Sequence, residues 1–471
     1  MSLIIPGVEI RVIRELVPRP LGATGVLGIV GHTEVDRTGR PLQALGSLQE
    51  FRDTFGAASL VAMPEVRQAF AAGLSQVVVA NLPADPVNRA AAEEPVLAGG
   101  TAAKLEFTAR AGGAWANQVF VRVLTRTAAA GDELVEVQVF YPNQETVAET
   151  FRNLSSRRGH ERYFVDVINR ESGFVKAEVK AGLAVDAKVV PMNTNPETTP
   201  RRLTGGFDPS AEVYAMGLAK LEAFGEVDMV TASHLHGEVE ATRIWAEVLS
   251  HCDRMSRVAR NRIGFGQTVL TESGAPDMEV TRRMASRLPS DRFVFVAPHG
   301  YMGSVIGMIA GLRYFESPTF KTLGGVSSLS FDFTDQNLVA LIQSGVCAVD
   351  EVQRKGIACV KGITTDASQI NVTRVADRAV RTVQNIAQDF IGLLNTEEQR
   401  LALKQRITEA FTRMEKEGSI VPSTDGKSPA FAVSVESTPD DFAAGIVRVG
   451  TALRPVRAID YIYATIKVQA F

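Results

Sequence analysis

The chain has 471 residues, of which 45% are hydrophobic and 22% charged, a composition ordinary for a soluble globular protein with about two to four domains. Its net charge of −3 argues against nucleic acid as the main partner. Three scattered cysteines are too few for a disulfide framework, and the N-terminus lacks the basic and long apolar regions of a signal peptide. We therefore expect assembly in the cytoplasm, without insertion into a membrane.

Residues 1–20 are predicted to form an N-terminal arm. Val8, Ile10 and Val12 alternate with charged residues, which is the period-2 pattern of a half-buried strand. Pro18 and Pro20 then stiffen the exit from the arm.

Residues 21–84 and 204–368 are predicted to form one α/β core domain. In its first part we expect strands at 25–31 and 76–80 and a helix at 63–73. Strands and helices then alternate, with strands at 227–232, 262–266 and 292–297 and helices at 208–224, 237–252, 277–288 and 301–313. Asp208 is expected to cap the helix at 208–224. This alternation predicts a largely parallel sheet covered by helices.

The helix at 301–313 carries three glycines spaced four apart. Gly303, Gly307 and Gly311 fall on one face of the helix. We expect another element to pack closely against that face.

Residues 85–203 are predicted to form a β-rich domain inserted into the core domain. Short strands separated by turn residues are expected at 104–109, 118–124, 134–141 and 163–169. A polar, proline-rich linker at 191–200 leads back to the α/β pattern.

Residues 369–455 are predicted to form a C-terminal α+β domain. A helix is expected at 374–391, and a second begins at Thr396, where Gln399 completes a capping-box pattern. The buried stripe of the second helix is expected at Leu403, Ile407, Phe411 and Met414. Two strands, 430–436 and 445–454, follow and can form a sheet that is too small to be stable alone.

Residues 456–471 are predicted to form a second terminal strand. Its apolar face consists of Ile462, Ala464, Ile466 and Val468, and polar residues occupy the other face. Two terminal strands with exposed edges are an aggregation hazard in a monomer. We therefore expect both to be donated to sheets of neighbouring subunits. Folding back onto the same subunit is the alternative.

Five segments along the chain carry a resemblance to a known family. They are I-P-G-V-E at 5–9, L-T-G-G-F-D at 203–208, A-P-H-G-Y-M-G at 297–303, I-N-V-T-R at 370–374, and the tail from Phe442 to Ile462. In this order and spacing they resemble motifs of the contractile tail sheath proteins of myophages and related contractile injection systems. The resemblance covers nearly the whole chain except the inserted domain.

This resemblance implies a structural subunit, not an enzyme, with no catalytic, cofactor-binding or metal residues and no cofactor. It implies a sixfold helical sheath around an inner tube, in a phage tail or an injection particle, that shortens on triggering and drives the tube through an envelope. The implied partners are further copies of the chain, the inner tube protein, and baseplate and tail-terminator or cap proteins. Nucleic acid and membrane lipid are not among them.

Within this framework, the exchanged residues are Val8, Ile10, Val12, Ile462, Ala464, Ile466 and Val468, and the 430–454 hairpin of a neighbour accepts them. The inserted domain is expected to face outward. For the inner-tube contact we expect the exposed face of the helix from Thr396, through Lys404, Arg413 and Lys416. A merely solvated helix face is the alternative for these three residues.

Other functions have weaker support in the sequence. His234 and His236, with Glu238, could ligate a metal ion, but two such histidines are more often loop residues at a sheet edge. Residues 426–428, G-K-S, resemble the end of a phosphate-binding loop whose first glycine is missing. Cys347 and Cys359 are expected to pack as small hydrophobic residues. A closed-ring shell protein and an α/β enzyme remain the alternative functions.

Overall fold

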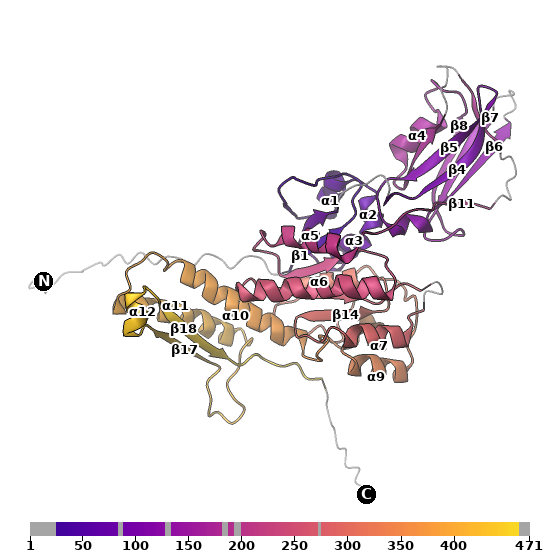
Figure 1. The fold of residues 1–471 in the computed structure, drawn as a ribbon. Helices are drawn as coiled ribbons and strands as arrows, with labels where there is room; N and C mark the ends of the chain where they lie inside the picture. Colours follow the sequence, from indigo (N-terminus) through magenta and orange to yellow (C-terminus); the bar gives the residue numbers. More distant parts are fainter. Residues whose placement is uncertain are drawn as a thin grey trace, which may run out of the picture. The chain divides into compact units, whose positions relative to one another are not determined.

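The computed structural model describes residues 25–82, 88–127, 133–180, 187–192, 199–271 and 275–460 (Figure 1). These residues divide into two compact units. The larger unit holds residues 25–378 and 455–460, and the smaller holds 379–454. The boundary falls inside helix α10, Ile370–Gln388. In the described part of the chain, no helix is long and apolar enough to cross a membrane.

An eight-stranded sheet forms the centre of the larger unit, in the order β16-β15-β14-β13-β12-β1-β3-β2. Its strands are β1 Val26–Gly31, β2 Ala44–Leu45, β3 Gln76–Asn81, β12 Met229–Ala232, β13 Ile263–Gln267, β14 Phe293–Ala297, β15 Val346–Val352 and β16 Gly356–Cys359. The strands from β15 to β3 run parallel, and antiparallel β16 and β2 form the two edges. The predicted parallel sheet is confirmed.

Helices cover both faces of this sheet, because its central strands are apolar on both sides. Every residue of β1 and β14 is buried, as expected for parallel strands between two helical layers. Helices α5, Ala211–Leu221, and α6, Glu238–Arg257, pack on the face that carries Gly28 and Gly264. Helices α3, Pro64–Ala72, and α8, Met302–Gly311, pack on the other face. The unit also contains α1 Leu48–Phe55, α2 Ser59–Ala62, α7 Met278–Ser286 and α9 Asp335–Gln343.

The close approach predicted for the glycine face of α8 is confirmed, and α3 is the element that makes it. A Cβ atom on Gly307 would overlap the carbonyl group of Ala69, and one on Gly303 would overlap the backbone of Glu65. The two helices can therefore touch only where α8 has no side chain. This contact places Glu65 near the carboxyl ends of the parallel strands.

The described residues between β3 and α5 form two separate four-stranded sheets, ordered β10-β4-β5-β9 and β11-β6-β7-β8. The strands are β4 Ala91–Ala98, β5 Thr101–Ala109, β6 Phe120–Thr127, β7 Glu133–Phe140, β8 Val147–Ser155, β9 Val175–Val179, β10 Val189–Pro191 and β11 Arg201–Arg202. They share a hydrophobic core of their own, which includes Phe107 and Trp115. The β-rich character is confirmed, whereas the limits of a domain at 85–203 and its outward position stay predictions.

One strand predicted in this region is wrong. Residues 163–169 belong mostly to helix α4, Phe164–Glu171. Its buried residues are Phe164, Val165, Val167 and Ile168. This i, i+1, i+3, i+4 spacing fits one face of a helix. The strand was predicted because the segment is rich in β-branched residues, which are common in strands.

The smaller unit contains the end of α10, helix α11 Glu397–Lys416, strand β17 Phe431–Glu436, helix α12 Pro439–Ala443 and strand β18 Arg448–Leu453. The predicted start of α11 is confirmed, because the Thr396 side chain accepts a hydrogen bond from the N–H of Gln399. The predicted stripe is also confirmed, since Leu403, Ile407, Phe411 and Met414 are buried.

Candidate assembly interface

The sheet of the smaller unit consists of β17 and β18 alone. The two strands pair antiparallel from Phe431 opposite Leu453 to Glu436 opposite Arg448. Within the described residues, neither strand pairs with a third one, so each keeps one edge of N–H and C=O groups without a strand partner. Such edges are templates for a strand from another chain.

Helix α11 supports one face of this sheet, and the rings of Phe411 and Phe431 lie 5.6 Å apart. Even so, no residue of β17 or β18 is fully buried. At the turn between the strands, Thr438 caps α12 and Arg448 forms an ion pair with Asp441 at 2.8 Å. The hairpin is thus held in shape while its apolar face stays only partly covered.

The residues predicted for strand exchange lie outside the described residues. This applies to Val8, Ile10 and Val12 of the arm and to Ile462, Ala464, Ile466 and Val468 of the terminal strand. Their part in subunit exchange therefore stays a prediction.

The root of the terminal strand is described, and the larger unit holds it. Gln369 accepts a hydrogen bond from the N–H of Ala458 and donates one to its carbonyl oxygen, at 2.9 and 3.1 Å. Asn371 donates to the carbonyl oxygen of Val456, and Lys361 lies 3.9 Å from Asp460. These anchoring residues were missed from the sequence, although Asn371 lies in the 370–374 motif. They hold residues 456–460 on the larger unit.

The three residues predicted to contact an inner tube are all exposed on α11. Arg413 and Lys416 lie about one turn apart and share a side of the helix. Lys404 precedes Arg413 by nine residues, which is about two and a half turns, so it points to the opposite side. The structure therefore brings two of the three cations together and separates the third.

The carboxyl edge of the parallel sheet is where an α/β enzyme would bind its substrate. The order of the strands reverses between the parallel neighbours β1 and β12, because the chain continues from β1 to β3 on one side and reaches β12 on the other. The crevice at such a switch point is the usual ligand site. Here His32 follows β1 and Ser233 follows β12. Backbone from the β-rich region lies against His32, because Gly112 packs directly against its ring.

Asp208 closes this crevice. Its carboxylate accepts hydrogen bonds from the N–H groups of Ala114 and Leu235, at 3.2 and 2.7 Å, so it joins the β-rich region to the loop after β12. The predicted role of Asp208 as a helix cap is therefore wrong. Ser210 takes the N-cap position of α5, and the Asp208 side chain turns toward these long-range donors instead.

The preceding glycines explain the rest of the 203–208 motif. A Cβ atom on Gly206 would come within 2.6 Å of the carbonyl oxygen of Gly113. The side chain of Asn117 donates to the Gly206 carbonyl oxygen and accepts from the Gly206 N–H, at 2.7 and 3.0 Å. The motif therefore fastens the segment between β5 and β6 to the point where the chain returns to the core.

The buried carboxyl group of Glu65 has hydrogen-bond partners at this edge. Glu65 accepts hydrogen bonds from the Ser233 hydroxyl at 2.7 Å and from the Gln267 amide at 3.4 Å. Burial raises the pKa of Glu65 to about 7, against the opposing effect of these hydrogen bonds. His32 comes within 3.7 Å of Asp208, but burial lowers its pKa more than Asp208 raises it. The contact is therefore not an ion pair near neutral pH.

The predicted metal alternative finds no support in this geometry. The rings of His234 and His236 lie 5.6 Å apart, but Glu238 is paired with Arg283 at 2.7 Å. Across the described residues, no group of three or more histidine, cysteine and acidic side chains is placed to hold a metal ion.

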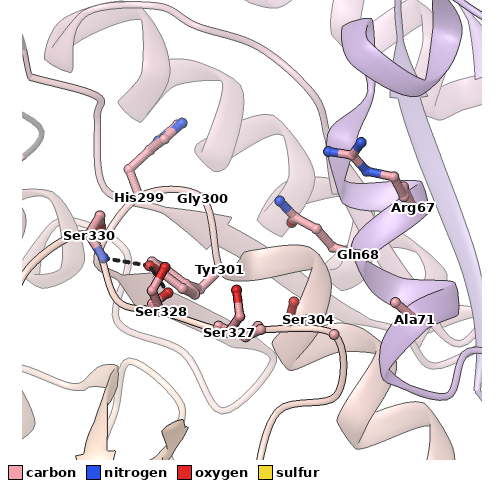
Figure 2. A pocket seen from close by; sticks show the side chains of 12 residues that line it. Arg67, Gln68, Ala71, His299, Gly300, Tyr301, Ser304, Ser327, Ser328 and Ser330 are labelled. Carbon is pink, nitrogen blue, oxygen red and sulfur yellow. Dashed lines mark hydrogen bonds between the residues drawn. The ribbon is translucent and has the colours of Figure 1, made fainter. Parts of the chain in front are cut away.

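An open pocket of about 450 Å³ lies beside this edge, between α3, the start of α8 and the loop at 325–330 (Figure 2). Arg67 reaches it from α3, and its other polar groups are mainly serine hydroxyls. Tyr301 holds the loop, because its hydroxyl accepts a hydrogen bond from the N–H of Ser330 at 2.7 Å. His299 directs Nδ1 to the carbonyl oxygen of Thr268 at 2.8 Å, away from the serines.

Comparison with known proteins places this geometry among sheath proteins. A tail sheath protein of Bacillus phage SP01 is 29% identical over 180 residues, 32% of this chain and 30% of that protein. A sheath tail protein from Listeria innocua has a TM-score of 0.52 at 12% identity, with 93% of each chain covered. The contracted helical sheath of the anti-feeding prophage has a TM-score of 0.56 at 13% identity, with 98% of this chain and 99% of that chain covered. No protein-family profile matches the chain.

The chain has the fold of a contractile sheath protein. The predicted resemblance to tail sheath proteins is thereby confirmed. The sequence match spans less than a third of the length of the SP01 protein, so its support is local. The match in fold extends over nearly the whole chain and includes the β-rich region that carries no shared motif.

Proposed function

We propose that the chain is the structural subunit of a contractile sheath, which polymerises as a sixfold helical tube around an inner tube and shortens to drive that tube through a target envelope. The observation that carries this proposal is the likeness in fold, over 98% of the chain, to the helical sheath of the anti-feeding prophage. The closed crevice at the switch point supports a structural role over a catalytic one. A head-to-tail contact that does not close into a ring produces such an open helical array.

Each subunit lends its terminal strands to neighbours, and the β17–β18 sheet of a neighbour accepts them. Two observations support this proposal: the strand edges without partners in that sheet, and the anchoring of residues 456–460 on the larger unit. The eleven residues from 461 to 471 span about 36 Å when extended, at about 3.3 Å per residue. That length is enough to leave one subunit and reach the next.

The stroke is a change between two packings of the same subunits, during which the backbone hydrogen bonds of the exchanged strands persist. The linkers at Pro18–Pro20 and at Arg454–Pro455 act as hinges. The second linker lies where the chain passes from the smaller unit back to the larger one. The energy is stored in the extended lattice, and no nucleotide is needed. A requirement for ATP in the contraction of purified particles would contradict this mechanism.

The inner tube is held in the extended state by cations on α11. Of the three residues predicted for this contact, Arg413 and Lys416 can act together, while Lys404 faces another way. Reversing the charge of Arg413 and Lys416 should give sheaths that do not stay extended around tubes, and reversal of Lys404 alone serves as the matched control. Normal extended particles from the double variant would remove α11 from the tube contact. Baseplate and terminator proteins complete the proposed set of partners.

Electron microscopy of the purified chain in negative stain tests the proposal directly. We expect hollow, striated tubes, and in particles that contain the inner tube we expect both long and shortened forms. Discrete closed rings would favour a shell protein instead. A monomer with no higher assembly at any concentration would contradict both.

A further inference from the structure

Two of the three cysteines touch each other at the edge of the eight-stranded sheet. Cys347 lies in β15 and Cys359 ends β16, and their Sγ atoms are 3.1 Å apart. Both side chains are fully buried. The strand register sets Cys359 opposite Val349, so Cys347 is the next residue along β15 on the same face. Sequence spacing alone did not pair them.

The two sulfur atoms must come closer to form a bond. A disulfide bond needs a distance of about 2.05 Å, so about 1 Å of further approach is required. β16 is the edge strand of the sheet and pairs with β15, and residues 320–323 form backbone hydrogen bonds to its other side. We propose that Cys347 and Cys359 form a disulfide bond when the protein meets an oxidising medium, and that this bond fastens β16 to β15.

The oxidant is a small-molecule disulfide of the glutathione type. The thiolate of one cysteine attacks it, forms a mixed disulfide and releases one small thiol. The second cysteine then attacks the protein-bound sulfur of the mixed disulfide and releases the second small thiol. Both cysteine protons are lost, the protein is oxidised by two electrons, and the small disulfide is reduced by two.

The reduced pair is protected while the protein remains in a reducing compartment. The hydrogen bond with Cys347 and burial together raise the pKa of the Cys359 thiol well above its ordinary value. A protonated, buried thiol is a poor nucleophile, so oxidation takes place as the chain folds or when the sheet edge opens. Cys252 lies apart on α6, is also buried, and provides an internal reference.

The bond would matter most in a sheath. After β16 the chain runs through residues 360–369 into α10, which leads to the smaller unit, so β16 is the last strand of the sheet before that connection. Only this consequence rests on the proposed function. The thiol chemistry can be tested in the isolated subunit, whether or not it polymerises.

The test is to produce the full chain in a reducing and in an oxidising bacterial cytosol, and to alkylate free thiols under denaturing conditions. We expect three alkylated cysteines from the reducing strain and one, Cys252, from the oxidising strain. Arg354 and Lys355 lie between the paired cysteines, so trypsin separates the two. A peptide pair joined through Cys347 and Cys359 should therefore appear by mass spectrometry, and it should separate on reduction.

Two alanine variants complete the test. Cys252→Ala should retain the joined peptides, whereas Cys359→Ala should leave Cys347 alkylated in both strains. Three alkylated cysteines from folded wild-type protein of the oxidising strain would overturn the proposal, as would a bond that includes Cys252. Because the readout is covalent, a failure to form tubes would bear on the proposed function and not on this bond.

Discussion

The eight-stranded sheet and the two-stranded sheet differ in how their faces and edges are covered. In the larger sheet, helices cover both faces, every residue of β1 is buried, and short antiparallel strands form the edges. In the smaller sheet, α11 lies on one face, no residue of β17 or β18 is fully buried, and each strand has an edge without a described partner.

The two sheets therefore differ in how complete each is within its own chain. The larger sheet buries its own apolar surface, and its hydrogen-bonding groups are paired along the ladder from β3 to β15. The smaller sheet has two strands, fewer than an independently stable sheet usually has. A two-stranded sheet whose edges lack a described strand partner is what the proposed exchange of terminal strands requires.

Removing residues 461–471 should have the largest effect on assembly. The truncated chain should fold as a soluble monomer but form no tubes, because the strand that completes a neighbour's sheet is gone. The cut follows Asp460 and keeps the contacts of Gln369 with Ala458, so thermal unfolding of the monomer should shift little. Sedimentation and electron microscopy measure assembly, and calorimetry measures unfolding.

A control truncation distinguishes donation from local packing. Removing residues 457–471 also deletes the anchored root and should lower the unfolding temperature further, without changing the assembly defect. Long tubes from the shorter truncation would show that the terminal strand is not needed between subunits. Outright unfolding of that variant would show that the strand belongs to its own subunit.

A single proline should weaken the same contact. Ile466→Pro removes one N–H donor from the strand, and the unpaired acceptor costs about 1–3 kcal/mol, which is roughly five- to 150-fold in the association constant of each contact. The minimum protein concentration for tubes should rise accordingly in turbidity measurements. Lys467→Ala is the matched control, since it keeps the N–H and lies on the polar face. Equal behaviour of the two variants would contradict a hydrogen-bonded strand.

Asp208→Ala tests whether the larger unit is held closed by its own contacts. The change leaves the N–H groups of Ala114 and Leu235 without their acceptor in a partly buried site and should cost about 3 kcal/mol of unfolding free energy. Urea unfolding of the monomer measures it. Glu212→Ala removes the same charge from an exposed position on α5 and should change little. Similar midpoints for both would mean that Asp208 does not close the crevice.

Local patterns predicted the elements well where one face of an element is apolar and regular. The stripe of α11, its Thr396 cap, five of the parallel strands and the glycine face of α8 all follow from spacing, whereas the parallel strand β15 was not predicted. The strand predicted at 163–169 is wrong because β-branched residues there sit at helical positions. Propensity and spacing disagreed in this segment, and burial against the β-rich core decided for the helix.

The contacts that organise the interface and the crevice could not be predicted in the same way. Asp208 and Ala114 are 94 residues apart, and Gln369 and Ala458 are 89 apart. Nothing in the local sequence of Asp208 distinguishes a helix cap from a long-range acceptor. Resemblance to a family marked the motifs at 203–208 and 370–374 as present. Only the fold shows that the first packs against the β-rich region and that the second helps to hold residues 456–460.

Glu65 provides the finest test, because only a fully covered sheet can keep a carboxyl group from water. Its pKa is raised from about 4.5 to about 7 in the folded chain, chiefly by burial. The folded state therefore binds the proton more tightly than the unfolded state, and the unfolding free energy must fall as pH rises from about 4.5 to 7, by at most about 3 kcal/mol.

Glu65→Gln removes this dependence, so the stability of the variant relative to the wild type should rise across that window and level off above it. Glu212→Gln, at an exposed position, should show no such trend in urea titrations at matched pH. Parallel curves for the wild type and Glu65→Gln would mean that water reaches Glu65, and that the larger unit is less closed than its contacts indicate.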